Sequence, residues 1–226
     1  MRSYAKRTYR NRSFRYRIMF ADRKDAGRRL GEELKKRGVE ADIVLAVPRG
    51  GLPVGREVAD ALGLPLDIVA AKKMGAPHNE ELAVGAASAD GSVWLNRILI
   101  DQLGVTDGYL QEERERAAET ARKKEQRYRG GRIGEAIQGR RVIVVDDGVA
   151  TGATTTACLR RVRAEGAEYV VLAVPVGAPE SVVRLRKEAN EIVCLETPEM
   201  FGAVGQFYER FGQVSDEKAM KYLKID

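Results

Sequence analysis

One loop of the sequence combines acids, a glycine and threonines in a spacing suited to a sugar phosphate. An apolar run at 142–145 is followed by Asp146 and Asp147, and then by residues 151–154, which open a helical pattern. Backbone N–H groups at a helix N-terminus bind phosphate, and Gly152 lets the backbone approach closely. Ionised carboxylates accept hydrogen bonds and suit the vicinal hydroxyls of a sugar. The spacing predicts a diol site beside a phosphate site.

The residues around the acids decide this interpretation, because a lone Asp-Asp-Gly is most often a turn that caps a helix. Here an apolar strand precedes the acids and Thr-Gly-Ala-Thr follows them, which favours the sugar phosphate site. A P-loop needs glycine, four residues and then Gly-Lys-Ser/Thr. No lysine lies in residues 144–154, so nucleoside triphosphate hydrolysis is disfavoured.

A second loop, Pro48-Arg49-Gly50-Gly51, follows the short apolar run 43–47. Its glycines permit conformations that expose consecutive N–H groups, and the forked guanidinium of Arg49 donates well to phosphate oxygens. Taken alone, this sequence is more often a plain turn, and the first loop is what favours an anion site. Ligands of an open parallel sheet bind at the carboxyl ends of its strands, where both loops are expected.

The elements that position these loops indicate an α/β fold. Apolar runs typical of buried strands occur at 43–47, 66–71, 84–88, 93–95, 142–145, 169–174 and 191–195. Stretches of helical character lie between them, around 26–34, 54–62, 106–129, 151–165 and 179–188. The charged stretch 106–129 is typical of a solvated surface helix, and Asp90-Gly91 is typical of a hairpin turn. We expect a mostly parallel sheet flanked by helices, with a β-hairpin.

The chain has a net charge of +6, and the excess of basic residues lies in its first 17 residues. Residues 1–17 contain seven Lys and Arg and no acid, whereas residues 18–226 contain 32 Lys and Arg against 33 acids. No apolar run is long enough to cross a bilayer, and no secretory signal is evident. Cys158 and Cys194 have no metal-ligand spacing, and a disulfide is not expected. We expect a cytoplasmic protein with a basic arm at 1–17, a core at 18–196 and a small aromatic-rich element at 197–226.

Residues 142–156 resemble the 5-phosphoribosyl-1-pyrophosphate (PRPP) signature of the type I phosphoribosyltransferases, an apolar strand, two acids and a Thr-Gly-x-Thr loop. Four other stretches are similar to a subgroup whose members are described only by the family name. They are residues 48–51, Lys-Met-Gly-Ala-Pro at 73–77, Glu-Leu-Ala-Val-Gly at 81–85 and Phe-Gly-Ala-Val-Gly-Gln-Phe-Tyr at 201–208. The resemblance covers about residues 18–226.

This resemblance implies a pentosyltransferase in which a nitrogen nucleophile displaces pyrophosphate from PRPP. In the family pattern Asp146 and Asp147 hold the ribose hydroxyls. The 5-phosphate lies on Thr151, Gly152, Ala153 and Thr154, and pyrophosphate contacts Arg49, Gly50, Gly51 and Lys73. The family often has a cis peptide bond at the position of Pro48 and Arg49. Mg²⁺ is the implied cofactor, bound through PRPP, with Asp146 and Asp147 as candidate protein ligands.

Type I enzymes also close a mobile loop over the reaction, and residues 72–82 resemble it. Lys73 begins the subgroup's Lys-x-Gly-Ala-Pro pattern and, with Arg49, is expected to stabilise the leaving group. Glu81 is a candidate for proton transfer, and a solvated acid or a salt bridge to Lys73 is the alternative. His78 departs from the pattern, and we expect an exposed loop residue there.

The expected acceptor is a nucleobase-like or amine compound. Ala150 stands where the 6-oxopurine branch usually has an aspartate, so hypoxanthine and guanine are disfavoured. In the element 197–226, Phe201, Phe207 and Tyr208 either form a hood over a planar base or pack on the sheet, and the sequence leaves both open.

Two other functions remain as alternatives. One is a regulator that binds PRPP or nucleotides without turnover. The other is nucleic-acid binding through residues 1–17, whose arginines and aromatics suit phosphate contact and stacking. A mitochondrial targeting segment is a minor interpretation of the same arm. The resemblance implies a homodimer whose ligands are PRPP and a small-molecule acceptor, without membrane association.

Overall fold

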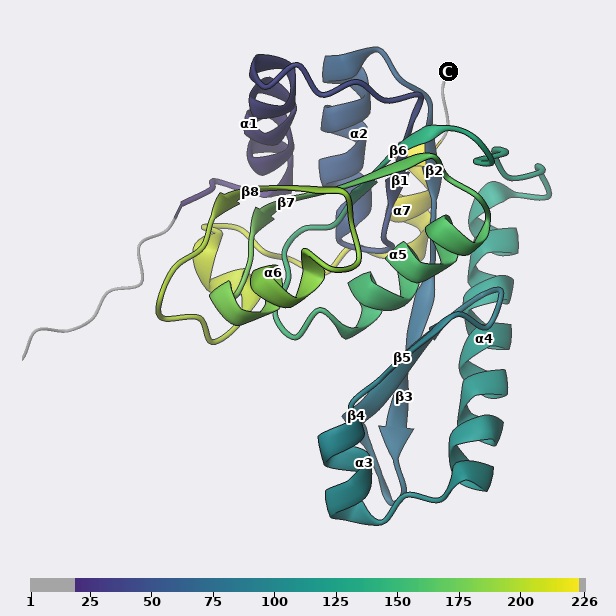
Figure 1. Cartoon of the computed structure of the whole chain (residues 1–226). Helices are drawn as coiled ribbons and strands as arrows, with labels where there is room; N and C mark the ends of the chain where they lie inside the picture. Colours follow the sequence, from purple (N-terminus) through teal and green to yellow (C-terminus); the bar gives the residue numbers. More distant parts are fainter. Residues whose placement is uncertain (1–18, 224–226) are drawn as a thin grey trace, which may run out of the picture.

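The computed structural model describes residues 19–223, in which a parallel sheet and a smaller antiparallel sheet are flanked by helices (Figure 1). The basic arm predicted at 1–17 lies outside the described residues. The elements in chain order are α1 (Arg23–Lys36), β1 (Ile43–Ala46), α2 (Gly51–Leu62), β2 (Leu66–Ile68), β3 (Ala71–Ala76), β4 (Asn79–Ser88), β5 (Val93–Leu95), α3 (Arg97–Leu103), α4 (Asp107–Arg129), β6 (Arg141–Val145), α5 (Ala153–Ala164), β7 (Tyr169–Val176), α6 (Pro179–Leu185), β8 (Glu191–Glu196), the 3-10 helix η1 (Val204–Phe207) and α7 (Asp216–Leu223).

The parallel sheet has five strands in the order β2-β1-β6-β7-β8, which confirms the predicted α/β fold. β1 and β6 are neighbours, with Ala46 opposite Val145, so both strands end at the same edge of the sheet. Every residue of β1 is buried, as are Val142–Val145 of β6, because helices cover both faces. The two predicted anion loops therefore leave the sheet side by side.

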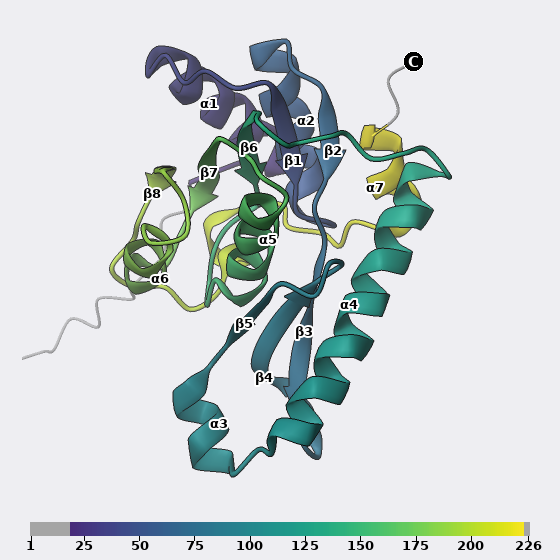
Figure 2. The same cartoon turned by 45° about the vertical axis from the view of Figure 1, so that its right-hand side comes forward.

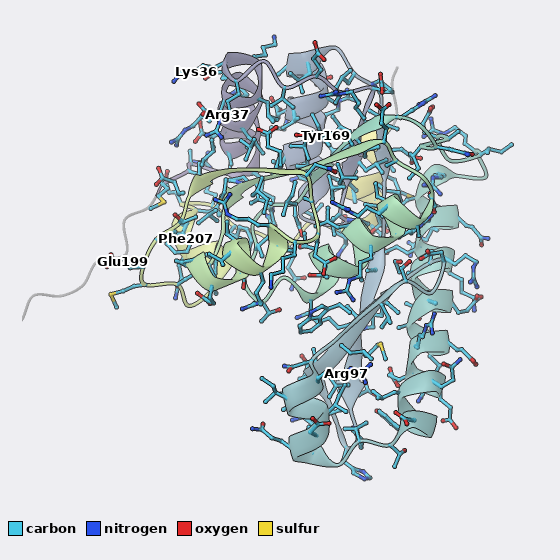
Figure 3. All side chains as sticks on the ribbon, viewed as in Figure 1. Lys36, Arg37, Arg97, Tyr169, Glu199 and Phe207 are labelled. Carbon is cyan, nitrogen blue, oxygen red and sulfur yellow. The ribbon has the colours of Figure 1, made fainter. Side chains whose placement is uncertain are left out.

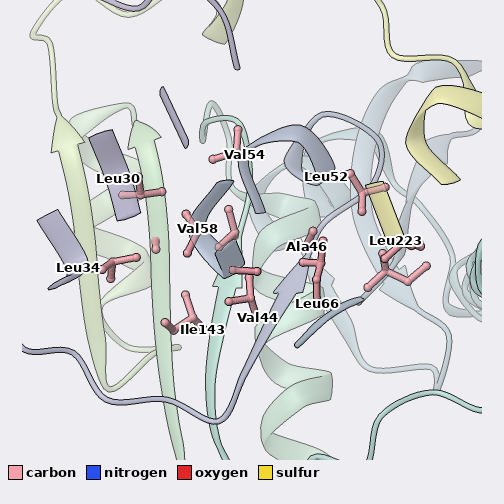
Figure 4. Close-up of a cluster of buried hydrophobic side chains, with 14 of the residues drawn as sticks. Leu30, Leu34, Val44, Ala46, Leu52, Val54, Val58, Leu66, Ile143 and Leu223 are labelled. Atoms are coloured by element: carbon pink, nitrogen blue, oxygen red, sulfur yellow. The ribbon is translucent and has the colours of Figure 1, made fainter. Parts of the chain in front are cut away.

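Two apolar clusters hold the helices on the sheet. On one face α1, α2 and α7 contribute Leu30, Val58 and Leu223 to a single buried cluster (Figure 4). On the opposite face α5 and α6 contribute Leu159 and Leu185. Between residues 19 and 223, no helix combines the length and apolar character needed to span a bilayer.

Strands β3, β4 and β5 form the antiparallel sheet, and α4 packs along it (Figure 2). Residues 72–82 are therefore not an irregular loop, because most of them lie in the paired strands β3 and β4. Met74 and Val84 are fully buried in a cluster with residues of α4, which supplies the packing that a pair of strands needs. His78 lies in the turn between the strands, exposed as predicted, with a positive φ of 63°. The hairpin predicted at Asp90-Gly91 joins β4 to β5.

The prediction also differs from the structure between β2 and β3 and at α3. The run 66–71 was expected as one strand, but β2 ends at Ile68 and β3 begins at Ala71, where the chain passes from one sheet to the other. Helix α3 was not predicted, since its seven residues are too few to show a helical period.

Helix α4 is a solvated surface helix only in part. Its sequence spacing allows three i,i+4 pairs, of which Glu119–Lys123 and Glu125–Arg129 form, at 3.5 and 3.2 Å. The third, Glu112–Arg116, is replaced by a pair of Arg116 with Glu113 at 2.9 Å. Glu125, however, is only 3% exposed. It also pairs with Arg161 of α5, and its Oε1 accepts the N–H of Ala70 at 2.7 Å. A buried charge thus fixes α4 to the junction between the two sheets.

The segment after β8 returns to the start of the described chain. The N–H groups of Met19 and Phe20 donate to the carbonyl of Phe207 at 2.9 and 3.0 Å. The rings of Phe20 and Tyr208 lie 5.3 Å apart, and Phe207 and Tyr208 are 1% and 4% exposed. Figure 3 shows Phe207 near β8 and Arg97 far from it on the antiparallel lobe. Phe207 and Tyr208 therefore pack on the core and present no open ring face.

Candidate functional site

The two predicted anion loops are in direct contact. A Cβ built on Gly50 would lie 1.9 Å from Oδ2 of Asp147, and one built on Gly51 would lie 2.7 Å from the carbonyl oxygen of Val145 and 3.4 Å from Oδ1 of Asp146. Only glycine leaves room for this approach at both positions. The structure thus brings together the predicted pyrophosphate loop and the predicted ribose acids.

The loop before α2 places Arg49 at the entrance of the site. The peptide bond between Pro48 and Arg49 is cis, in agreement with the resemblance described above. The Arg49 side chain is 46% exposed, and its guanidinium lies 3.7 Å from the carboxylate of Asp216, at the start of α7. Arg49 therefore faces solvent with a weak ion pair that an incoming anion can replace.

Asp216 holds two groups of α4 as well as Arg49. Arg127 pairs with it at 2.7 Å, and the hydroxyl of Tyr128 donates to it at 2.5 Å. The hydrogen bond from Tyr128 and the charges of Arg127 and Arg49 lower the pKa of Asp216. Burial, followed by the charge of Arg49, lowers the pKa of Lys124 on the same helix. Arg49 and Arg127 share the single carboxylate of Asp216, so the side of the site near Arg49 has an excess of positive charge, which suits an anion.

The predicted phosphate loop, residues 151–154, lies at the N-terminus of α5. Gly152 has φ +74°, and its carbonyl accepts both the N–H and the hydroxyl of Thr156 at 2.8 Å. The first N–H groups of a helix have no acceptor within it, so they are available to an anion. Ser181 and Arg184 of α6 donate to the carbonyls of Ala150 and Thr151 at 2.5 and 3.1 Å and hold the loop from behind.

The two acids share a half-buried position at the end of β6. The N–H of Asp147 donates to Oδ1 of Asp146 at 2.8 Å, and Arg23 pairs with Oδ2 of Asp147 at 2.8 Å. Burial raises the pKa of Asp146, and the neighbouring charge of Asp147 raises it further. Burial also raises the pKa of Asp147, while the charge of Arg23 opposes that shift.

Arg23 and Asp216 are site residues that the sequence did not indicate, and Tyr208 contacts the site in a way that the sequence did not predict. Arg23 is the first residue of α1, and Asp216 begins α7, both far along the chain from the loops they contact. Tyr208 was considered as part of a hood, but its hydroxyl donates to the carbonyl of Asp147 at 2.6 Å. No local pattern distinguishes these residues, because the hydrogen bonds of Tyr208 and Arg23 to Asp147 span 61 and 124 positions of the chain.

Lys73 and Glu81 lie on the antiparallel lobe. Lys73 is exposed on β3, opposite Ala86, and Glu81 is exposed on β4 close to the turn that joins the two strands. Among the described residues, no ion pair joins Glu81 to Lys73. The structure does not bring Glu81 to the acid pair, so its part in proton transfer stays a prediction.

A cavity of about 440 Å³ opens beside the phosphate loop. Its walls include Trp94 of β5, Asn96, Ala150, Thr151 and Phe201. Trp94 packs against the first turns of α5, and Phe201 is half-buried. Of the three aromatic residues considered as a hood, Phe201 is the one that faces this cavity.

The acid pair can contribute to a magnesium site. Within residues 19–223 there is no group of three or more His, Cys, Asp or Glu placed to hold a metal. Mg²⁺ commonly uses one or two carboxylates together with substrate phosphates and water. Two half-buried carboxylates beside an anion loop fit that arrangement, in which the substrate supplies the other oxygens.

Comparison with known proteins adds to this geometry. The model of the phosphoribosyl transferase domain matches residues 86–211, which include the acids and the phosphate loop but not residues 48–51. A Mycobacterium tuberculosis protein named "Putative phosphoribosyl transferase Rv0571c" is 43% identical over 206 residues, 91% of this chain and 46% of that protein. The chain spans about half the length of the curated relatives of this kind that it matches.

Two other proteins are similar over most of the chain. The crystal structure of TT1426 from Thermus thermophilus has a TM-score of 0.77 and 45% sequence identity, and the match covers 91% of this chain and 98% of that one. The amidophosphoribosyltransferase of Mycobacterium bovis is 30% identical over 163 residues, 72% of this chain and 24% of that protein.

Proposed function

Because the chain belongs to the phosphoribosyl transferase domain family, we propose that it transfers the phosphoribosyl group of PRPP to a nitrogen acceptor. The observation that carries the proposal is the contact of Gly50 with Asp147, which supports a diphosphate loop next to a pair of ribose-binding acids. PRPP is a ribose with vicinal hydroxyls, a diphosphate at C1 and a phosphate at C5. The loop 49–51, the acids Asp146 and Asp147 and the loop 151–154 follow one another in the same order as the diphosphate, the ribose hydroxyls and the 5-phosphate of PRPP.

Each part of PRPP then has a partner in the chain. The 5-phosphate accepts hydrogen bonds from the N–H groups and hydroxyls of residues 151–154. The ribose hydroxyls donate to Asp146 and Asp147. The diphosphate lies on the loop of residues 49–51, with Arg49 and Lys73 as its cationic partners.

The reaction breaks the bond from C1 to the diphosphate oxygen and forms a bond from C1 to nitrogen, after which the nitrogen loses a proton. Positive charge develops on the ribose and negative charge on the leaving group. Arg49, Lys73 and the exposed N–H groups of the 49–51 loop stabilise the leaving group. When bound through PRPP, Mg²⁺ supplies further charge neutralisation there, with Asp146 and Asp147 as its protein contacts. Glu81 is our candidate to take the proton.

The cavity beside the phosphate loop suits a planar acceptor. Trp94 and Phe201 offer aromatic surface on its walls, and Ala150 provides no carboxylate with which to recognise a polar base edge. Aromatic packing therefore selects the acceptor at this position, while the phosphate loop fixes the sugar. We place a nucleobase-like acceptor or an aromatic amine here.

A pyrophosphate-release assay over a panel of purines, pyrimidines and amines, with PRPP and Mg²⁺, tests the proposal. We expect release that requires one class of acceptor, and Asp147→Asn should reduce it strongly. Asp101→Asn, an exposed aspartate on α3, is the matched control and should leave the rate unchanged. Calorimetry of PRPP binding accompanies the assay.

The two measurements separate the alternatives. Binding of PRPP without pyrophosphate release from any acceptor would identify a regulator without turnover. Absence of PRPP binding by the folded wild-type protein would reject the proposed function. Size-exclusion chromatography with light scattering checks the proposed homodimer.

A further inference from the structure

Arg23 is directed at the acid pair although it belongs to a different part of the fold. It is the first residue of α1, and its Nε donates to Oδ2 of Asp147 at 2.8 Å. The side chains of Arg23 and Asp147 are only 12% and 14% exposed. A charge-assisted hydrogen bond between half-buried partners is stronger and better ordered than one at the surface.

The guanidinium of Arg23 is fixed by the segment after η1. One terminal nitrogen donates to the carbonyl of Gly212 at 2.8 Å. The Cζ atom of the guanidinium lies over the ring of Phe211, 3.7 Å from its centroid. Phe211 in turn packs on Tyr208, with ring centroids 5.0 Å apart, and Tyr208 donates to the carbonyl of Asp147. Tyr208, Phe211 and Gly212 therefore hold both Asp147 and the cation that contacts it.

Arg23 has Asp147 as its carboxylate partner because the nearer acids are engaged elsewhere. The carboxylate of Asp22 accepts hydrogen bonds from the guanidinium of Arg210 at 2.9 Å and from the N–H of Asp25 at 3.0 Å. Asp25 accepts the N–H of Ala21 at 3.1 Å. Within the described residues the one ion pair of Arg23 is with Asp147.

The contact leaves one oxygen of Asp147 for another donor. Nε of Arg23 donates to Oδ2 of Asp147 and a terminal nitrogen donates to the carbonyl of Gly212, so the interaction with the carboxylate is not bidentate. Between residues 19 and 223 no side chain donates a hydrogen bond to Oδ1, so this oxygen can accept a hydroxyl. An arginine held by three groups is a fixed support, and it does not need to leave when a sugar binds.

We propose that Arg23 is a positioning residue for PRPP, which orients Asp147 so that Oδ1 meets a ribose hydroxyl. The inference rests on the proposed function, since it assigns the means by which that site is held in shape. Preorganised groups lose less entropy when the ligand binds, so the effect is on ligand affinity. It also assigns a role to the aromatic segment 207–212 that does not involve stacking on a base.

The test compares Arg23→Gln with Arg23→Lys and with Arg210→Gln as the matched control. Arg210 is a neighbouring cation of the same region, but it pairs with Asp22 and does not touch Asp147. Calorimetry measures the Kd of PRPP with Mg²⁺, and steady-state kinetics measure kcat and KM. We expect Arg23→Gln to raise Kd and KM for PRPP about tenfold or more, with a smaller change in kcat. Arg23→Lys should recover part of the affinity, and Arg210→Gln should match the wild type.

A general loss of structure would have a different signature. It would lower the apparent kcat and the binding stoichiometry while KM stayed constant. Phe211→Leu, which keeps an apolar side chain and removes the ring beneath the guanidinium, should also weaken PRPP binding, by less than Arg23→Gln.

Three outcomes are decisive. If the wild type binds PRPP and folded Arg23→Gln binds it equally well, the inference is wrong and the proposed function stands. Tighter binding by Arg23→Gln would overturn the inference too, since Arg23 would then compete with the ribose. Failure of the wild type to bind PRPP would reject the proposed function first.

Discussion

The carboxylate of Asp147 occupies the space that a side chain at position 50 would need. A Cβ on Gly50 would lie 1.9 Å from Oδ2 and 2.5 Å from Cγ of Asp147. Real Cβ contacts are not this short, so residue 50 and residue 147 constrain each other. The proposed diphosphate loop and the proposed ribose acids therefore form one structural unit, although they lie about a hundred positions apart in the chain.

Gly50→Ala should therefore disrupt the proposed site. The new methyl group must displace either the Asp147 carboxylate or the loop backbone, and we expect PRPP affinity to fall by at least tenfold, about 1.4 kcal/mol. Calorimetry of PRPP binding checks this. Gly108→Ala is the control, since a Cβ there meets nothing within 4 Å and the residue lies in helix α4. Equal affinity of Gly50→Ala and wild type would contradict the proposed arrangement.

Trp94 is the single tryptophan of the chain and lines the proposed acceptor cavity. Trp94→Leu should raise KM for the acceptor several-fold, because aromatic packing contributes about 0.5–1.5 kcal/mol beyond buried area. KM for PRPP should not change. In the wild type, saturable quenching of tryptophan emission by the acceptor reports the same contact. An unchanged KM for the acceptor would show that the acceptor does not bind against Trp94.

Asp216 should make stability depend on pH. The hydrogen bond from Tyr128, and then the charges of Arg127 and Arg49, lower its pKa from the ordinary 3.8 in the folded state. The unfolded chain therefore binds a proton first as pH falls, and the stabilisation is present above pH 3.8 and lost below it. The difference in urea midpoint between wild type and Asp216→Asn should be largest near neutrality and shrink below pH 3.8. Tyr128→Phe, which removes the same hydrogen bond, should reduce this pH dependence.

Glu125 should contribute far more to stability than a surface acid of the same helix. Its side chain is 4% exposed, pairs with Arg129 and Arg161 and accepts the N–H of Ala70. Glu125→Ala leaves the N–H of Ala70 without its acceptor and removes one carboxylate from both arginines, while Arg129 keeps Asp67 and Arg161 keeps Glu165. Removal of one member of a buried ion pair costs about 3–5 kcal/mol. Urea unfolding measures this loss. Glu119→Ala, on the exposed side of α4, should cost less than about 1 kcal/mol. Equal losses in both variants would show that the buried pair is not a structural anchor.

The sequence was sufficient to predict the parallel sheet and the positions of the two loops at its edge, since these depend on short patterns. An apolar run followed by acids, glycine and threonine identifies a strand, a turn and a helix N-terminus without knowledge of distant residues. Short patterns carry no information on contacts between distant residues, so the sequence did not predict such contacts. Arg23 looks like an ordinary helix-start cation, and its contact with Asp147 exists only because the end of β6 and the start of α1 lie near each other in the fold. Residues 72–82 contain glycine and proline, but α4 stabilises them as strands.

The contacts of residues 208–212 have a consequence for the order in which the site is completed during synthesis. A nascent chain that ends at residue 200 already contains every strand of both sheets and all of residues 48–51 and 146–154. It still lacks Tyr208, Phe211 and Gly212, the groups that hold Asp147 and Arg23. The strands and both loops are therefore synthesised before the residues that hold the proposed site in shape. Affinity for PRPP should appear only after residues 208–212 have been synthesised.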